Sequence, residues 1–241
     1  MAVTAAGRAL TDAHRAAQAR IAAATTVDLV RIWPALDQLD LDATTERWLR
    51  LAVPAIERRR RQSQELARTY YDRLRLVEAP EVEPLPVVEL RPLPGAQVTT
   101  SLLVTGPISI KQGASLRAAE AAQAAAGSRQ ALNGGREVIT DTVNADPAVK
   151  RVRRVTSPGC CAFCAMLATR DQLPPFSGGH WFKAHDNCMC QPEPAWDDGA
   201  GQTAQAAEFA RIYRESTDGV GSSGNKKLNA FRQALAASRA G

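Results

Sequence analysis

The stretch SPGCCAFCAMLATRDQLPPFSGGHWFKAHDNCMC, residues 157–190, holds all five cysteines and two of the three histidines of the 241-residue chain. Two residues separate Cys161 from Cys164. Twenty residues later His185 and Cys188 repeat that spacing, and Cys190 follows. Two residues between ligands allow one tight turn to present both side chains to the same ion, and a tetrahedral centre needs two such pairs. The spacing therefore predicts a structural Zn²⁺ site.

Two ligand sets fit this spacing. In the first, Cys161, Cys164, His185 and Cys188 bind the metal and Cys190 is spare. In the second, Cys188 and Cys190 both bind, because residues two apart in an extended segment point to the same face, and His185 then supports the ligands by hydrogen bonding. The sequence leaves both sets open.

Cys160 is the weakest candidate ligand, because its neighbour Cys161 would point the other way in a strand that enters the turn. A pair of disulfides, or free thiols in a core, are the alternatives to a metal. The first residues of the chain are interrupted by charges and do not form a signal peptide, and no apolar run approaches the roughly 20 residues that cross a bilayer. We therefore expect a reducing cytoplasm, which favours metal-bound thiolates.

The sequence does not favour an enzyme. A hydrolase would have to use His180 or His185 with Asp186, and no Ser/His/Asp set or glycine-strained nucleophile turn accompanies them. The His-Glu-x2-His pattern of zinc proteases is absent from the sequence. We expect no catalytic residues and no small-molecule substrate.

Composition favours a helical protein. Hydrophobic residues make up 45% of the chain, but alanine dominates them and aromatic residues are only 5%, so we expect thin cores between helices. The EAPEVEPLPVVELRPLPG segment contains five prolines and predicts a stiff, extended linker. We expect an elongated, two-domain α+β chain, mainly helical, with a small β-hairpin zinc-binding domain. The expected division is a helical domain at 1–77, a linker at 78–98, an α+β domain at 99–200 and a helical tail at 201–241.

Hydrophobic periodicity and breakers give the individual elements. Thr25 to Asp28 reads as a helix cap that starts a new helix, Pro54 as a kink or a late start, and Asn133-Gly134-Gly135 as a turn. Residues 150–156 alternate charge and valine and predict a half-exposed strand, which residues 188–196 would join as a hairpin. The expected helices are 4–24, about 45–77, 115–126, 136–144, 202–215 and 226–235.

Basic residues are unevenly distributed. Residues 1–77 carry 13 basic and 9 acidic residues, within a net charge of +5 for the whole chain. Solvated helix faces account for many such runs, but contact with DNA or another acidic surface also fits. A Gly/Ser segment at 219–224 leads to a short basic helix that we expect to be flexible and to dock on a partner. The candidate DNA contacts are Arg58, Arg59, Arg60, Arg61, Lys226 and Lys227.

Several motifs together resemble the MuF-like minor capsid, or head morphogenesis, proteins of tailed bacteriophages, in the form found in phages of actinobacteria. The closing His-x-x-Cys-x-Cys has Met189 where that family usually has arginine. The resemblance spans residues 58–190. Its motifs are Arg-x-x-Ser-x-x-Leu-Ala-x-x-Tyr-Tyr (from Arg60), Gly-Arg-x-x-Ile (Gly135, Arg136, Ile139), Arg-Val-Thr (from Arg154), Cys-Ala-Phe-Cys-Ala-Met-Leu-Ala (Cys161 to Ala168) and the closing motif (His185 to Cys190).

The resemblance implies a virion protein present in few copies inside the capsid, near the portal, with the host cytoplasm as its location during assembly. It implies contacts with the portal or major capsid protein, possible contact with packaged DNA, no membrane and no catalytic role. The alternative is a zinc-containing nucleic-acid-binding protein. Against that alternative, residues 158–241 carry 8 basic and 8 acidic residues, whereas DNA-reading zinc modules concentrate basic residues beside their ligands.

Overall fold

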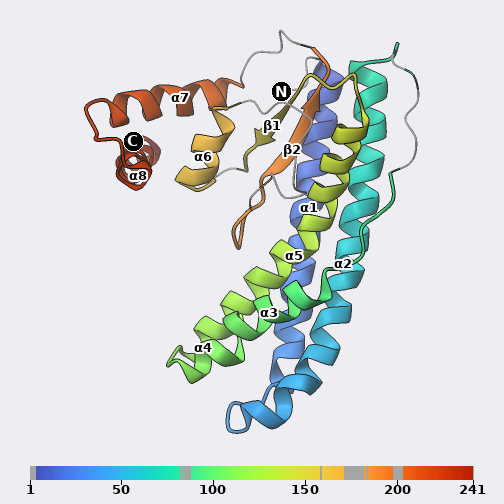
Figure 1. Ribbon diagram of the computed structural model, residues 1–241, viewed down its shortest axis with the longest axis vertical. Helices are drawn as coiled ribbons and strands as arrows, with labels where there is room; N and C mark the ends of the chain where they lie inside the picture. The colour runs from blue at the N-terminus through green and yellow to red at the C-terminus, as the bar shows by residue number, and fades with distance from the viewer. Residues whose placement is uncertain are drawn as a thin grey trace.

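The computed structural model describes residues 4–81, 83, 88–157, 159–170, 182, 184–197 and 203–240. Figure 1 shows a long bundle of helices with a smaller unit on one side of its upper half. The elements in chain order are α1 (Ala5–Ile32), the 3-10 turn η1 (Trp33–Ala35), α2 (Leu41–Glu78), α3 (Gly95–Thr105), α4 (Pro107–Lys111), α5 (Leu116–Ala145), β1 (Arg151–Val155), α6 (Ala162–Ala168), β2 (Gln191–Ala195), α7 (Ala204–Thr217) and α8 (Gly224–Ala240).

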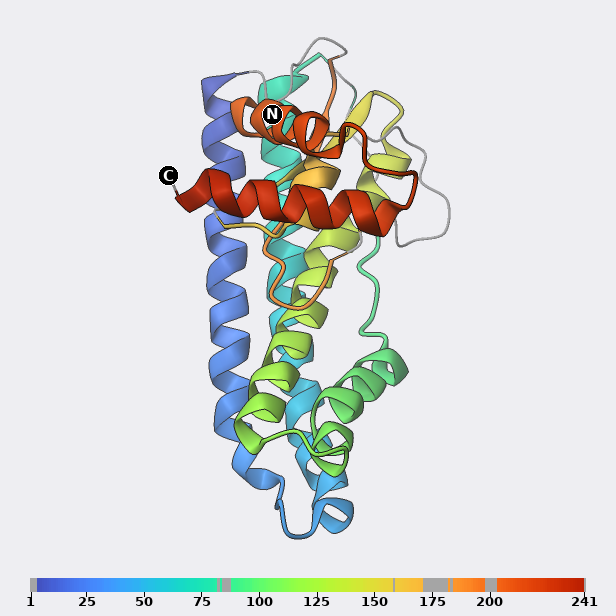
Figure 2. The ribbon, with the colours of Figure 1, turned by 90° about the vertical axis from the view of Figure 1, so that its left-hand side faces the viewer.

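Helices α1, α2 and α5 form the bundle, and α3 and α4 pack against the lower half of α5 (Figure 2). One core cluster near the lower end includes Leu29, Trp48 and Leu102, which belong to α1, α2 and α3. A second cluster, near the strands, joins Tyr71 of α2 to Ile139 of α5 and to residues of β1. The mainly helical α+β class predicted from the sequence is confirmed.

The two ranges assigned to separate domains share these cores. Helix α5 follows the predicted linker but packs along α1 and α2, which precede it. Linker residues are also fastened to α2, because Gln64 donates to the carbonyl of Arg91 at 2.8 Å and Arg68 donates to the carbonyl of Val88. Residues 78–98 therefore connect two parts of one bundle, and the boundary predicted there does not separate two hydrophobic cores.

Helix α1 runs without a break through residues 25–28, where a new helix start was predicted, so that prediction is wrong. The buried Thr25 donates its hydroxyl to the carbonyl of Ile21 at 2.7 Å. A threonine that bonds the carbonyl four residues back is satisfied inside a helix and does not act as a cap. Pro54 also lies inside one continuous helix, α2.

Helix α5 is likewise continuous through Gly127 and residues 133–135, where a helix end and a turn were predicted. These glycines provide close helix crossings. A Cβ at Gly135 would lie 2.6 Å from the Ser63 hydroxyl oxygen, and a Cβ at Gly127 would lie 2.3 Å from a Leu29 methyl group. The glycines therefore let α5 approach α1 and α2, and tertiary packing overrides their tendency to end a helix.

Strands β1 and β2 form the predicted antiparallel hairpin sheet, with Arg153 opposite Glu193 and Val155 opposite Gln191. The expectation of a half-exposed strand is wrong, because β2 is buried throughout and β1 from its second residue on. The bundle packs on β2 through α5, and α6 contacts β1. The alternation of charge and valine in β1 therefore does not separate an outer face from an inner one.

Helices α7 and α8 form a hairpin that packs on α6 (Figures 1 and 2). Phe231 and Leu235 of α8 are buried in one cluster with Phe209 of α7 and with Cys164 of α6. The basic helix predicted to dock on a partner thus packs within its own chain. None of the helices in the described ranges is long and apolar enough to cross a membrane.

Candidate metal centre

The hairpin sheet brings the two halves of the cysteine motif together. Val155 at the end of β1 pairs with Gln191 at the start of β2, so the segment that follows β1 and the segment that precedes β2 lie side by side. Cys161 and Cys164 come from the first segment, and His185, Cys188 and Cys190 come from the second. All five predicted ligands therefore lie in one region, although Cys161 and His185 are 24 positions apart in sequence.

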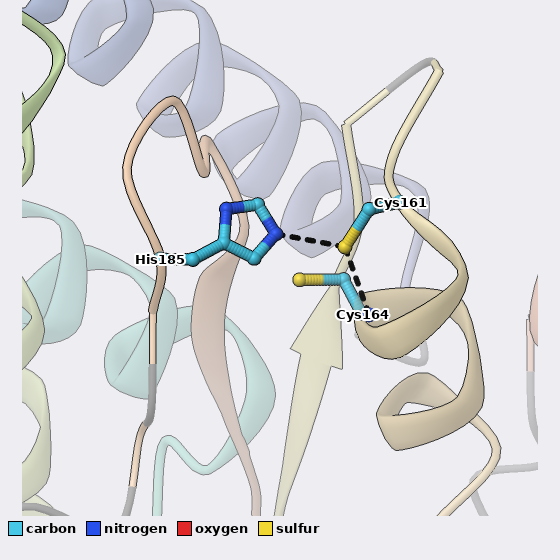
Figure 3. Close-up of side chains that lie close together, drawn as sticks. All are labelled: Cys161, Cys164 and His185. Atoms are coloured by element: carbon cyan, nitrogen blue, oxygen red, sulfur yellow. Dashed lines mark hydrogen bonds between the residues drawn. The ribbon is translucent and has the colours of Figure 1, made fainter. Parts of the chain in front are cut away.

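The ligand atoms form two groups that share Cys164. The first group is Cys161, Cys164 and His185, shown in Figure 3, where the imidazole points at the Cys161 sulfur. The second group is Cys164, Cys188 and Cys190, all of them buried. Within each group the ligand atoms lie within 4.8 Å of one another, which is close enough for a metal ion to be held.

Local backbone structure orients these side chains. Cys161 is the N-cap of α6, and its sulfur accepts the backbone N–H of Cys164 at 3.4 Å. In the second segment, the N–H of Cys188 donates to the carbonyl of His185 at 3.1 Å. Asn187 takes a φ of 62° in this turn, a left-handed conformation that asparagine tolerates better than most residues. Each half of the motif thus has its own tight turn, as the spacing predicts.

Hydrogen bonding shifts the pKa values of Cys161 and His185 in opposite directions. Burial opposes the charged form of Cys161, but the N–H of Cys164 and the imidazole of His185 outweigh burial and lower the pKa of Cys161. Burial likewise opposes a charged His185, and hydrogen bonds with the Cys161 sulfur and the Asp186 carbonyl outweigh it and raise the pKa of His185. The Cys161 Sγ and the His185 Nε2 lie 2.8 Å apart, within hydrogen-bonding distance.

The pKa values of the buried thiols Cys164 and Cys188 shift in opposite directions. The Cys164 and Cys188 sulfurs lie 3.5 Å apart. Hydrogen bonds from the thiols of Cys164 and Cys190, together with the positive charge of Arg136, lower the pKa of Cys188. The bond to Cys188 correspondingly raises the pKa of Cys164. The surroundings therefore favour thiolate charge at Cys188 and oppose it at Cys164.

This donor set fits Zn²⁺. Thiolates and imidazole are the ligands that zinc takes, and tetrahedral bonds of about 2.3 Å place two sulfurs about 3.8 Å apart. The observed 3.5 Å between Cys164 and Cys188 is near that separation and far longer than a disulfide bond, and all five cysteines are free. The contact between Cys161 and His185 is shorter than two ligands of one ion would allow. One of these two side chains must therefore move outward if both bind.

Cys160 lies outside both ligand groups. It is buried, its sulfur accepts a hydrogen bond from Arg239 of α8 at 3.7 Å, and burial raises the pKa of its thiol. This position agrees with its rank as the weakest candidate.

His185 and Asp186, two residues of the hydrolase alternative, do not form a side-chain dyad. The carboxylate of Asp186 accepts from Arg129 at 2.5 Å, whereas the His185 ring pairs with the backbone carbonyl of Asp186. His180 lies outside the described residues.

Arginines near the cysteines were not predicted as part of the site. Arg136 of α5 donates to the carbonyls of Cys188 and Cys190. Arg154 of β1 lies 3.8 Å from the Cys164 sulfur and 3.7 Å from the centre of the Phe182 ring. The only sequence signal was the place of both arginines in motifs of the resemblance, since spacing gives no sign that a residue on another element reaches the ligands.

The predicted DNA contacts on α2 are largely engaged within the fold. Arg60 is 1% exposed and pairs with Glu137 of α5, so its assignment as a DNA contact is wrong in this conformation. Arg59 pairs with Asp28 at 2.8 Å and Arg61 with Glu57 at 2.7 Å. Arg58 is exposed.

The α8 lysines differ from the α2 arginines. Lys226 is exposed and Lys227 is half-buried, and within the described residues neither has an ion pair. Residues 219–241 contain no acidic residue. Among the candidate DNA contacts, Arg58, Lys226 and Lys227 therefore have no ion pair within the described residues.

Comparison with protein-family models identifies the family of this chain. The chain matches the VG15 protein family over residues 6–216, which covers the bundle, the cysteine cluster and α7. No curated protein and no solved structure matches it. The matched region is most of the chain, and the chain therefore belongs to the VG15 protein family, a phage-associated family.

Proposed function

We infer that this phage protein is a structural minor capsid, or head morphogenesis, protein in which a zinc ion fastens the smaller unit of the fold together. The observation that carries the inference is the convergence of five ligand side chains from two segments beside α6, β1 and β2. The surrounding apolar side chains of α6, α7 and α8 are the setting of a structural metal. The proposal assigns the chain no catalytic role and no small-molecule substrate.

When bound, zinc would supply a closed set of bonds between the two ligand segments. Cys161 and Cys164 would hold it from the start of α6. Cys188, with His185 or Cys190, would hold it from the segment before β2. Each ligand pair anchors one end of the intervening loop, and the free energy of metal binding then becomes folding free energy of this unit.

The MuF-like motifs and the phage family support a place inside the capsid, near the portal. We propose the portal protein, the major capsid protein or both as partners, and the host cytoplasm as the location during assembly. Purified virions analysed by quantitative mass spectrometry should contain the chain in few copies, and portal-containing assembly intermediates should contain it too. Its absence from both virions and portal-containing intermediates would contradict the proposal.

Contact with DNA is the alternative role, as a zinc-containing nucleic-acid-binding protein. The observation in its favour is the basic character of α8, where Lys226 and Lys227 project from a segment without acidic residues. Contacts with phosphate groups alone give weak, sequence-independent binding that falls steeply with salt. Binding isotherms at several salt concentrations separate the two roles, because sequence-selective binding that survives moderate salt would favour the alternative.

A further inference from the structure

The guanidinium of Arg136 connects the helix bundle to the ligand segment. Arg136 lies on α5 and is 2% exposed. Its Nε donates to the carbonyl of Cys190 at 3.2 Å, its Nη2 donates to the carbonyl of Cys188, and its Nη1 donates to the side-chain oxygen of Asn133 at 2.9 Å. All three nitrogens are therefore used, and two of them bind the backbone of candidate ligands.

The backbone of Arg136 is itself fixed. The preceding residue, Gly135, lies where α5 closely crosses α2, and its N–H donates to the Ser63 hydroxyl at 3.1 Å. A planar guanidinium presents its donors in a fixed geometry, so the two carbonyls it binds are also fixed relative to the bundle. The ligand segment thus takes its position from α5 through this side chain.

The charge of Arg136 is a second observation that connects this residue with the candidate metal centre. Its acceptors among the described residues are two carbonyls and one amide oxygen, all neutral. A buried guanidinium is costly without a compensating negative charge. The guanidinium carbons of Arg154 and Arg136 lie 3.7 Å and 5.8 Å from the centre of the Phe182 ring, and Arg154 also donates to the Cys164 sulfur, so a second positive charge lies near the sulfurs. A zinc ion with three or four thiolates carries a net negative charge and would offset it.

We propose that Arg136 is the positioning residue of the metal centre: it holds the backbone of Cys188 and Cys190 in the ligand position and offsets the charge of their thiolates. This inference rests on the proposed zinc site. It also accounts for the Gly-Arg pair of the Gly-Arg-x-x-Ile motif, because the glycine permits the helix crossing and the arginine reaches the ligands.

The test compares zinc affinities of Arg136→Lys, Arg136→Gln and the wild-type chain, measured by competition with a chromogenic chelator. Loss of a partner that orients metal ligands typically costs about 10- to 100-fold in affinity. We expect a loss of that size for Arg136→Lys, which keeps the charge but not the planar fork, and a larger loss for Arg136→Gln. In both variants, the sulfur-to-cobalt charge-transfer bands of the Co²⁺-loaded chain should shift or weaken.

Arg60→Lys is the matched control. Arg60 is equally buried and also contacts α5, through Glu137 and the Gln130 carbonyl, but it has no hydrogen bond to the described residues of the cysteine segment. We expect it to lower thermal stability and leave the zinc affinity and the cobalt spectrum unchanged. Folded Arg136 variants that bind zinc as tightly as wild type would overturn the inference, as would an equal loss in Arg60→Lys.

A measurement on the wild-type chain covers the case in which the variants do not fold. The side-chain N–H groups of Arg136 should exchange slowly with solvent in the zinc form and quickly after chelation, whereas those of Arg60 should stay protected. Protection of Arg136 that is independent of zinc would overturn the inference. A wild-type chain that binds no zinc would instead refute the proposed metal site.

Discussion

His14 shows how one residue creates a pH dependence. Its side chain on α1 is 4% exposed and its ring stacks on Tyr70 of α2, with ring centroids 4.2 Å apart. Neither ring nitrogen has a hydrogen-bond partner within the described part of the chain. Burial lowers the pKa of His14 from 6.5 to about 3. The unfolded chain therefore binds a proton that the folded chain excludes between these pH values, and folding stability falls as pH falls below about 6.5.

We predict that His14→Phe reduces this acid sensitivity, because phenylalanine keeps the ring and cannot be protonated. Each pH unit below the pKa of the unfolded chain lowers the free energy of unfolding of the wild type by about 1.4 kcal/mol. Between pH 7 and pH 5, the free energy of unfolding of the wild type should therefore fall by about 2 kcal/mol relative to that of the variant. Urea unfolding of both proteins at the two pH values measures the change. Protonation of the metal ligands affects both proteins alike, so it cancels in the difference. Parallel pH profiles would show that His14 does not carry this effect.

The buried face of helix α8 packs into the smaller unit of the fold, which holds the cysteine cluster and is called the metal unit below. Phe231 packs edge to face on Tyr213 of α7 at 5.3 Å, and Leu235 lies in the same cluster as the buried cysteines. The cysteines thus contribute apolar surface to the core that holds α7 and α8, as well as ligands. Any rearrangement of the cysteine segment should therefore also change the packing of α7 and α8.

We predict that chelation of zinc releases α7 and α8 while the bundle stays folded. A structural zinc contributes on the order of 10 kcal/mol to the unit that holds it, and the bundle has its own cores. Amide hydrogen exchange should therefore accelerate in α6, α7 and α8 on addition of a chelator, whereas α2 and α5 serve as internal controls. Unchanged exchange in α8, or equal acceleration in α2, would contradict this coupling.

Over the whole molecule, the bundle and the metal unit are joined by several polar contacts between distant parts of the chain. The hydroxyl of Thr11 on α1 donates to Glu193 of β2 at 2.6 Å, and Arg129 of α5 pairs with Asp186 beside the ligands. Arg15 of α1 donates to the carbonyl of Thr156 at 3.0 Å. The contacts of Thr11 and Arg15 therefore join α1, which precedes the proline-rich segment, to residues that follow it.

The sequence predicted those features of the structure that depend on residues close together in the chain. Cysteine spacing located the cluster, alternation located the strands, and the helix expected at 136–144 ends within one residue of the end of α5 at Ala145. Sequence analysis failed where the role of a residue depends on a neighbour that is distant in sequence. Gly135 was read as a turn because its role depends on Ser63, and Arg60 was read as a surface charge because Glu137 lies on a helix 77 residues away. The contacts of Arg136 with the ligand segment were not predicted for the same reason.

Zinc content tests the central claim most directly. Wild-type protein purified under reducing conditions without added chelator should contain about one zinc per chain by elemental analysis, with mainly sulfur ligands by X-ray absorption. Cys164→Ser should lose most of that zinc, because Cys164 belongs to both ligand groups, whereas Cys160→Ser should keep it. Wild-type protein that lacks zinc and contains two oxidised cysteine pairs, or Cys160→Ser and Cys164→Ser variants with equal zinc content, would contradict the account.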